Sequence, residues 1–259
     1  MVKSNKRRDD ERRSAAAAKV AEMQRAQAAA ERRRRTLVVS AVAVAVIVIV
    51  VGVFVLIQTT GDDSKDVAAG GVGGSSADFG FVVGQSSAPA SMVVYEDFQC
   101  PVCKSFEDLD ASTVEKYVKD GSLKVEYRPI AFLDRMSEGT NYSTRSLNAA
   151  ACVSNATDVE TWKKFHDLLY ANQPEENTPG LTDEQLIGYA KQAGADTPAV
   201  ETCIKSQSFK DWTASATEAA SKAGVSGTPT VKLNGEDIAD KLSNVEAFSQ
   251  AIEAAAGKS

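Results

Sequence analysis

The chain has 259 residues, of which 43% are hydrophobic and 25% are charged. These fractions are ordinary for a globular protein and argue against a chain that is disordered throughout. The net charge of −6 is unevenly divided, because residues 1–36 carry 12 basic and 5 acidic side chains and the remainder is strongly acidic. An acidic main domain is a poor match for a nucleic-acid-binding protein, so we expect no nucleic-acid partner.

Residues 1–36 form a basic, alanine-rich tail that ends in four consecutive arginines and Thr36. Alanine favours helix, but the tail has no wide apolar stripe, so we do not expect it to fold alone. Two interpretations remain open for its charge. The tail either marks the cytoplasmic side of a membrane, which we favour, or binds anionic lipid headgroups.

Residues 37–57 contain no charged side chain, and Ser40 is their only polar one. As a helix they would span roughly 31 Å, about the hydrocarbon core of a bilayer. An unbroken apolar run of this length predicts a transmembrane helix rather than a buried core helix, and it is longer than the apolar part of a cleaved signal peptide. Because arginines precede the run and aspartates follow it, we predict a cytoplasmic N-terminus and an extracytoplasmic remainder, anchored in the lipid bilayer by one helix.

Residues 58–78 are rich in Gly, Ser and Asp, which predicts a flexible linker to a folded domain at residues 79–258. The domain begins with strand patterns at 79–84 and 92–95, a helical pattern at 101–119 and an alternating strand pattern at 123–129. Residues 130–133 either continue that strand or leave it. A strand, a helix and a second strand in this order fit a parallel βαβ unit.

A helical insertion is predicted at about residues 134–224, followed by a return to β structure. Breakers such as Pro174, Pro179-Gly180 and Pro198 separate five candidate helices, at residues 141–154, 159–170, 183–192, 199–206 and 210–223. A strand at 230–233, a hairpin turn at Asn234-Gly235, a weak strand at 237–240 and a helix at 245–255 complete the domain. The pattern predicts an α/β fold whose sheet is interrupted by helices.

The clearest chemical signal is a C-x-x-C pair, Cys100 and Cys103, with Pro101 after the first cysteine. Such pairs serve as metal ligands or in thiol–disulfide exchange. A structural zinc site needs four ligands, usually from two such pairs, and Cys152 and Cys203 are about 50 residues apart. We therefore expect no metal.

Thiol–disulfide exchange fits the position of the pair between a strand and a helix. The free amides and the dipole of a helix N-terminus stabilise a thiolate at Cys100, and Pro101 fits the first helical position. We expect Cys100 to be the exposed nucleophile. Cys103, one turn into the helix, would resolve a mixed disulfide. A purely structural disulfide has no need of a helix start.

The motif Asp-Phe-Gln-Cys-Pro-Val-Cys-Lys at 97–104 and the later Gly-Thr-Pro-Thr at 227–230 resemble the DsbA-like branch of the thioredoxin superfamily. The segment Trp-Lys-Lys-Phe-His-Asp-Leu-Leu-Tyr-Ala-Asn at 162–172 is also similar to that family, especially to its membrane-tethered or lipid-anchored forms in Gram-positive bacteria. The resemblance covers residues 79–255. It implies a thioredoxin-like fold in which a helical insertion separates a βαβ half from a ββα half containing a cis proline.

The resemblance also assigns roles to the second motif. It implies that Pro229 is a cis proline facing the dithiol, and that the backbone of Thr228 pairs with a substrate polypeptide beside Cys100. Without the resemblance, Gly-Thr-Pro-Thr would be interpreted as a plain turn before a strand.

The sequence departs from the family at two positions near the dithiol. Val102 stands where many strongly oxidising members have histidine, so we predict a lower reduction potential than theirs. Val94 stands where a buried acid often serves as proton acceptor, six residues before Cys100. Glu96 and Asp97 are the nearest replacements, although a solvated or hairpin-stabilising role suits them equally well.

Cys152 and Cys203 both fall in predicted helices, and an extracytoplasmic domain permits a disulfide between them. Such a bond would stabilise the fold by about 4 kcal/mol in the chain-entropy treatment. A second redox pair is the alternative, but neither cysteine has a helix-start context. His166 shares its predicted helix with Trp162 and Phe165, which favours a packing role over a catalytic one.

These observations predict a membrane-anchored, extracytoplasmic thiol:disulfide oxidoreductase that acts on secreted or cell-envelope polypeptides with free thiols. A membrane redox partner would reoxidise the dithiol, and no soluble cofactor is needed. Two other functions stay open. One is a reductase or isomerase of the same fold, and the other is a non-catalytic tethered module that senses redox state or binds unfolded chains.

Overall fold

The computed structural model describes residues 71–257 of the chain. The tail predicted at 1–36, the transmembrane helix predicted at 37–57 and most of the linker predicted at 58–78 lie outside these residues. Within the described part, no helix is both long enough and apolar enough to cross a membrane. The last linker residues belong to the folded domain, because Val72 is 2% exposed and the Gly73 amide donates to Asn155 Oδ1.

The domain is built on one sheet of five strands in the order β1-β3-β2-β4-β5. The strands are β1 (Phe81–Val83), β2 (Ala90–Glu96), β3 (Leu123–Pro129), β4 (Thr230–Leu233) and β5 (Glu236–Asp237). Strands β2 and β3 are parallel, as the βαβ pattern predicts, whereas β1 and β4 each run antiparallel to their neighbours. Strand β2 is central, which explains why its sequence is almost continuously apolar.

The alternation of side chains along β2 divides it between two faces. Met92 and Val94 are fully buried in the main core. Tyr95 points to the other face, where it packs with Ile130 and Ala220 in a smaller cluster. Because side chains two residues apart share a face, Glu96 follows Val94 into the main core.

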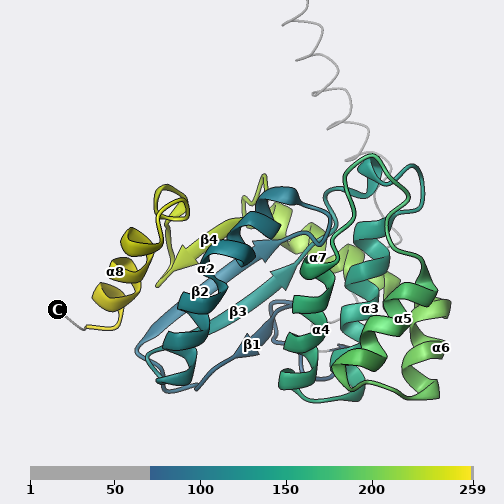
Figure 1. Cartoon of the computed structure of the whole chain (residues 1–259), viewed down its shortest axis with the longest axis horizontal. Coiled ribbons are helices and arrows are strands. Elements are labelled where there is room, and N and C mark those ends of the chain that lie inside the picture. Colours follow the sequence, from purple (N-terminus) through teal and green to yellow (C-terminus); the bar gives the residue numbers. More distant parts are fainter. Residues whose placement is uncertain (1–70, 258–259) are drawn as a thin grey trace, which may run out of the picture. The chain divides into compact units, whose positions relative to one another are not determined.

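Helix α2 (Pro101–Lys119) starts directly after β2 and connects it to β3. Its buried stripe is Cys103, Phe106, Glu107, Asp110, Val114 and Tyr117. Helix α8 (Val245–Ala255) lies beside α2, where the rings of Phe106 and Phe248 meet edge to face. Figure 1 shows α2 crossing the sheet and α8 at the end far from the insertion.

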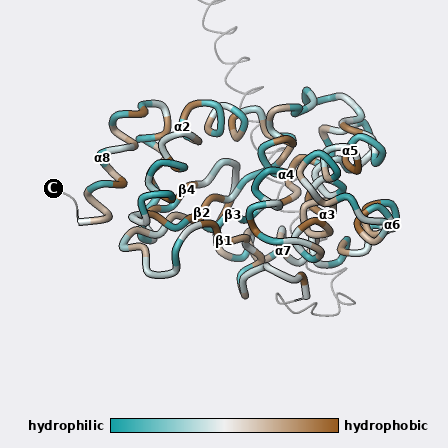
Figure 2. The backbone as a smooth tube through the Cα atoms, turned by 60° about the horizontal axis from the view of Figure 1, so that its bottom comes forward, coloured by the Kyte–Doolittle hydropathy of each residue, from teal (hydrophilic) through white to brown (hydrophobic). Residues whose placement is uncertain are grey.

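The insertion between β3 and β4 forms a helical layer at the other end of the sheet (Figure 1). After the short 3-10 turn η2 (Asp134–Met136), its helices are α3 (Tyr142–Ala156), α4 (Val159–Ala171), α5 (Asp183–Ala193), α6 (Pro198–Ser206) and α7 (Lys210–Lys222). Helix α3 is central and contacts the other four, which its small residues permit. Hydrophobic residues recur along the strands and α3 in Figure 2, in agreement with this core.

The predicted elements correspond closely to those observed, and most of their bounds differ by no more than two residues. The first strand begins at Phe81 rather than residue 79, because Phe79 has a positive φ of 64° that a strand does not accommodate. Residues 130–133 leave β3, which ends at Pro129. The weak partner strand predicted at 237–240 exists and pairs with β4, but its bounds are wrong, since β5 is Glu236–Asp237 and a 3-10 turn, η3 (Ala239–Lys241), follows.

Candidate functional site

The loop that carries the dithiol lies between the end of β2 and the start of α2. Cys100 is the N-cap of α2 and has extended backbone angles, and Pro101 takes the first helical position. Asp97 fixes this loop through the hydrogen bonds of its carboxylate. Its carboxylate accepts hydrogen bonds from Gln99 N at 2.9 Å, Leu133 N at 2.9 Å and Ser143 Oγ at 2.7 Å.

The interpretation of Asp97 as a solvated residue is wrong, because it is fully buried. Burial raises the pKa of the Asp97 carboxyl to about 6, although its hydrogen bonds act in the opposite direction. A carboxylate with three fixed donors is well suited to hold a loop in place.

The insertion also contacts this loop through Gln173, which follows α4. Its amide nitrogen donates to the carbonyls of Phe98 at 3.1 Å and of Cys100 at 2.9 Å. The side-chain amide of Gln99, within the loop, donates to Met136 O at 2.9 Å. Sequence patterns do not identify Gln173, because nothing along the chain links it to a motif 73 residues earlier.

Cys100 lies against the loop before β4. Its Sγ is 3.3 Å from Thr228 O and accepts from Cys103 N at 3.4 Å. Hydrogen bonding to the Cys103 thiol lowers the pKa of Cys100 to about 6, helped by Thr228 and by the amides at the helix start, and burial opposes these effects. The Cys100 side chain is therefore mainly a thiolate at neutral pH.

The expectation that Cys100 is exposed is wrong in degree. Cys100 is only 5% exposed, whereas Val102 is 60% exposed and forms the rim of the site. An open groove leads to the cysteine, and it is lined by Cys100, Pro101, Val102, Phe132, Leu133, Arg135, Glu176, Ser221 and Val225–Thr228. The peptide bond between Thr228 and Pro229 is cis, as the resemblance implies.

Cys103 lies on the opposite, buried side and is 1% exposed. Burial raises the pKa of its thiol well above the usual value, and Cys100 and the nearby charge of Glu96 act in the same direction. Both cysteines are free thiols in this structure. The two sulfurs therefore differ sharply in acidity, with the reactive one facing the groove.

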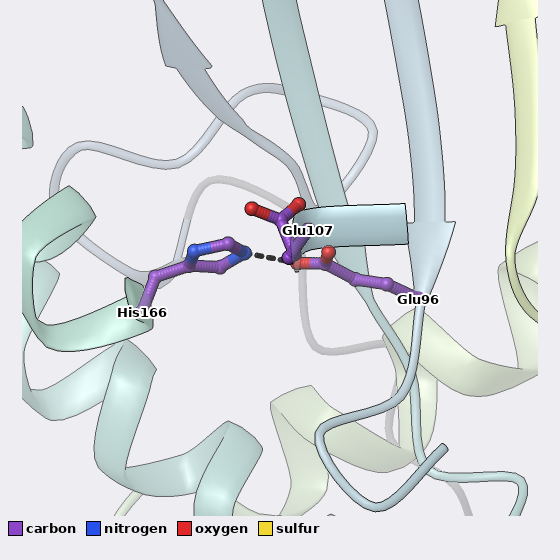
Figure 3. A group of neighbouring side chains, drawn as sticks. All are labelled: Glu96, Glu107 and His166. Carbon is purple, nitrogen blue, oxygen red and sulfur yellow. Dashed lines mark hydrogen bonds and ion pairs between the residues drawn. The ribbon is translucent and has the colours of Figure 1, made fainter. Parts of the chain in front are cut away.

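A buried ion pair joins β2 to α4 (Figure 3). His166 Nε2 is 2.9 Å from Glu96 Oε1, and His166 Nδ1 is 3.0 Å from Asp167 Oδ1. Burial lowers the pKa of His166, but the carboxylates of Glu96 and Asp167 outweigh it and raise the pKa to about 9. The imidazole is therefore charged at neutral pH.

The interpretation of Glu96 as a solvated residue is wrong too, because Glu96 is 1% exposed. His166 does pack among aromatic rings, as its helix predicts, with Phe98, Tyr127 and Tyr170 around it. The contact between His166 and Glu96 was not predicted from the sequence. One available signal was the strand alternation that places Glu96 on the same face as Val94.

Glu96, Glu107 and His166 are the described residues with ligand atoms close enough to hold a metal, all within 4.8 Å of one another. The direct bond between His166 and Glu96 occupies one ligand atom of each. Three ligands also fall short of the four of a closed structural zinc site. The expectation of no metal stays a prediction.

The remaining cysteines form a disulfide. Cys152 in α3 is bonded to Cys203 in α6, across 51 residues of sequence. The bond joins two helices of the insertion, and neither sulfur lines the groove at Cys100.

The folded domain resembles known proteins over most of its length. A family model described as thioredoxin matches residues 76–254. The structure resembles reduced DsbA from Mycobacterium tuberculosis, with a TM-score of 0.55 and 28% identity over 69% of this chain and 98% of that chain. It also resembles MdbA, a thiol-disulfide oxidoreductase from Corynebacterium diphtheriae, with a TM-score of 0.59 and 26% identity over 74% of this chain and 96% of that chain.

Two curated relatives extend the comparison. The serine/threonine-protein kinase PknE of Mycobacterium tuberculosis is 37% identical over 130 residues, which make up 49% of this chain and 23% of the kinase. The chain therefore spans less than a quarter of that relative. The probable disulfide bond formation protein D of Bacillus cereus is 24% identical over 59% of this chain and 69% of its own length. The chain belongs to the thioredoxin family, in its DsbA-like branch of thiol:disulfide oxidoreductases.

Proposed function

We propose that this protein forms or exchanges disulfide bonds in secreted or cell-envelope proteins through Cys100 and Cys103. The observation that carries the proposal is the contrast between the two sulfurs. Cys100 has a lowered pKa and faces an open groove, whereas Cys103 has a raised pKa and is buried beneath it. A disulfide between them would therefore be attacked at Cys100, because only that sulfur meets the groove.

The reaction then takes two displacement steps. A substrate thiolate attacks Cys100 Sγ, the bond between Cys100 and Cys103 breaks, and Cys103 leaves as a thiolate that takes a proton. A second substrate thiolate attacks the substrate sulfur of the mixed disulfide, and Cys100 leaves as a thiolate. Two electrons pass from the substrate to the dithiol. A membrane redox partner would accept these electrons and restore the disulfide, without a soluble cofactor.

The substrate polypeptide would bind along the segment before Pro229. Thr228 O lies 3.3 Å from Cys100 Sγ, so a chain paired with the Thr228 backbone would bring its own cysteine to the nucleophile. Phe132 and Leu133 line the same groove and offer apolar contacts.

Glu96 is the better candidate for the buried acid near the dithiol. Asp97 already has three hydrogen-bond donors that fix the loop. Glu96 Oε2 has no hydrogen-bond partner within residues 71–257, although it is buried. Glu96 and Val94 share a face of β2. Glu96 can therefore act as the buried proton acceptor that is missing at Val94.

The location of the enzyme rests on the sequence outside the described residues. The apolar run at 37–57 and the basic tail before it support a single-pass anchor with the catalytic domain outside the cell. Protease treatment of intact cells would test this topology. Digestion of the domain, with survival of an epitope at the N-terminus, is the expected result.

Trapping with a Cys103→Ser variant tests the proposed activity. Without the resolving thiol, the full-length protein should accumulate mixed disulfides with many envelope polypeptides, and a reducing gel should release them. Alkylation of thiols in living cells then gives the direction of flux. A pool oxidised at Cys100 and Cys103 supports an oxidase, and a reduced pool supports a reductase or isomerase. No mixed disulfides at all would favour a non-catalytic module.

We assign a structural role to the disulfide between Cys152 and Cys203. Replacing both by alanine should lower the free energy of unfolding by about 4 kcal/mol and leave the exchange rate unchanged. A large loss of exchange in a folded double variant would instead support a second redox pair.

A further inference from the structure

Two charged side chains, Arg135 and Glu176, line the groove at Cys100, and the exchange reaction proposed above uses neither of them. Arg135 lies in η2, and Glu176 lies in the loop between α4 and α5. The other residues that line the groove are all uncharged: Cys100, Pro101, Val102, Phe132, Leu133, Ser221 and Val225–Thr228. Selection of a substrate by charge in this groove therefore depends on Arg135 and Glu176.

The backbone at both charged residues is fixed beside the dithiol loop. Arg135 precedes Met136, and Glu176 precedes Asn177. The Met136 carbonyl accepts hydrogen bonds from Gln99 Nε2 at 2.9 Å and from Asn177 N at 2.6 Å. This carbonyl therefore joins three segments, namely η2, the loop after α4 and the dithiol loop. The two charges are thus attached to rigid backbone at the edge of the site.

Arg135 differs from the other two arginines of residues 71–257. Arg128 and Arg145 each form an ion pair with a carboxylate at about 3 Å. Arg135 is exposed and forms no ion pair or side-chain hydrogen bond within these residues. Its guanidinium is therefore available to a carboxylate from outside the domain, for which its planar set of N–H donors is well suited.

Two acids close to Arg135 along the chain or in space do not neutralise it. The Asp134 carboxylate accepts hydrogen bonds from Thr144 N at 2.9 Å and from Thr144 Oγ1 at 2.6 Å, so it is already used at the start of α3. Glu176 is half-buried and forms no ion pair with Arg135. The groove therefore presents one unpaired cation and one unpaired anion.

The cation at Arg135 contrasts with the charge of the domain around it. Residues 71–257 carry 15 basic and 27 acidic side chains. This excess of acids repels acidic polypeptides at long range, and dissolved salt screens that repulsion. At short range the attraction between a carboxylate and the Arg135 guanidinium is stronger than the average field of the domain.

We propose that Arg135 is a specificity-determining residue that favours substrate polypeptides with an aspartate or glutamate close to the reactive cysteine, and that Glu176 opposes this preference. This inference rests on the proposed exchange activity and names the class of substrate that the groove prefers. A chain paired with the Thr228 backbone would bring the residues that flank its cysteine into the groove that Arg135 lines. An exposed ion pair changes a rate or binding constant by about two- to fivefold.

The test compares dithiol peptides that differ only in one residue, Asp, Asn or Lys, placed near the first cysteine on either side. Each peptide in excess reduces the oxidised full-length protein, and samples are quenched with acid and alkylated. Each rate constant is divided by that of the same peptide with dipyridyl disulfide, a neutral reference that corrects for the acidity of the peptide thiol. At one position, Asp should react about threefold faster than Asn with the wild type at low salt. In about 1 M salt the ratio should approach one.

Two substitutions at Arg135 separate its charge from a structural role. Arg135→Gln should bring the ratio of Asp to Asn close to one, and Arg135→Glu should turn it to about one third. A structural role would instead lower the rate constants of all peptides alike and would not reverse the ratio. Glu176→Gln should raise the ratio, because the opposing charge is removed.

Lys164→Gln is the matched control for net charge. Lys164 is an exposed cation of α4 that does not line the groove, so its loss changes the charge of the domain as much as Arg135→Gln does. This variant should keep the wild-type ratio. A ratio that falls as far in Lys164→Gln as in Arg135→Gln overturns the inference, because the net charge of the domain would then set the preference.

Two further results overturn the inference and leave the exchange activity in place. One is a wild-type ratio of one at every position, which decides the matter even if a variant does not fold. The other is a ratio that is unchanged in folded Arg135→Gln. If the Asn peptides also fail to reduce the wild-type disulfide, the proposed exchange activity fails, and the inference fails with it.

Discussion

The two sides of the dithiol show how one short motif acquires two opposite chemistries. On the open side, hydrogen bonding to the Cys103 thiol lowers the pKa of Cys100 to about 6, helped by Thr228 and by the helix-start amides. On the buried side, one helical turn away, burial raises the pKa of Cys103 well above its usual value. The residue type is the same, so the surroundings alone create the difference.

The comparison also separates reactivity from exposure. Cys100 is 5% exposed and Cys103 is 1% exposed, so solvent contact differs little between them. Burial is the largest cause of the raised Cys103 pKa and opposes ionisation of Cys100 too, so polar neighbours decide the direction at Cys100. Cys100 has hydrogen-bond donors that stabilise a thiolate, whereas Cys103 has Glu96 and Cys100, whose negative charges oppose one.

Replacing one cysteine at a time should have the largest effect on exchange, and the two replacements should have different outcomes. Cys100→Ser removes the sulfur that lines the groove among residues 71–257, so we expect exchange with a peptide disulfide to be lost entirely. The reduced Cys103→Ser variant should still attack a peptide disulfide through Cys100, displacing one peptide thiolate, and should stop at the mixed disulfide because no second thiol resolves it. Mass spectrometry of the peptide adduct measures both outcomes.

Adducts on the other cysteine would contradict the assignment of Cys100 as the reactive sulfur. Stable adducts on Cys103 in the Cys100→Ser variant would show that the buried sulfur is reached by substrate. The Cys152→Ala/Cys203→Ala variant is a suitable control, since its two cysteines lie outside the groove.

His166 maintains the buried side, and its loss should cost a large part of the fold's stability. His166→Leu leaves the Glu96 carboxylate buried without its cation, which destabilises a protein by about 3–5 kcal/mol. Urea unfolding at pH 7 measures the change. The pKa of Cys100 should stay near 6, because the groups that lower it are Cys103, Thr228 and the amides at the helix start.

A double-mutant cycle with Glu96→Gln isolates the pair. We expect a coupling energy of about 1–3 kcal/mol between the two positions, as is usual for residues in direct contact. A coupling energy near zero would mean that His166 stabilises the protein by packing alone. Lys163→Met is the control, because Lys163 contacts Asp167 at a more exposed position of the same helix.

Much of this arrangement could be predicted from local patterns. The helix at 101–119 follows from Pro101 at its start and Asp120-Gly121 at its end, and its observed bounds agree. Asn234 and Gly235 form the expected turn, and both have the positive φ that this hairpin requires. Signals of this kind lie within a few residues of the feature they specify.

The contacts that the sequence did not predict join distant segments. Gln173 reaches Cys100 O across 73 residues, and His166 reaches Glu96 across 70. A single histidine on an apolar helix face predicts packing. His166 does pack among aromatic rings, but it also forms an ion pair with Glu96. Its partner could be identified only once the insertion was placed against β2, which no local pattern specifies.

The pH dependence of stability should also differ between the two sides. The folded pKa of His166 is about 9, above its usual 6.5, so its stabilising effect is full below pH 6.5 and is lost as the pH rises through 9. The raised pKa values of Asp97 and Glu107 have the same sign, with losses as the pH rises through about 6 and about 7. The oxidised protein should therefore lose stability steadily from about pH 5 to 9.

Reduction adds an effect of opposite sign. The lowered pKa of Cys100 adds stability as the pH rises from about 6 to 9, and this contribution exists only in the reduced protein. Urea unfolding of both forms at pH 5, 7 and 8.5 should show the reduced form declining less. Parallel curves would mean that the Cys100 thiolate receives no net stabilisation from the fold.

The smallest expected effect comes from the rim of the open side, where Val102 is 60% exposed and has no polar atom to offer Cys100. Val102→His should place an imidazole between the two cysteines, where its N–H groups or charge stabilise the thiolate. Each unit by which the Cys100 pKa falls corresponds to about 1.4 kcal/mol, or about 30 mV in the reduction potential of the pair. Equilibration with glutathione buffers measures the potential, and Val102→Thr is the control for a polar side chain without a charge. An unchanged potential in Val102→His, with a normal fold, would mean that the hydrogen bonds from Cys103 and the loop at Thr228 already set the acidity of Cys100.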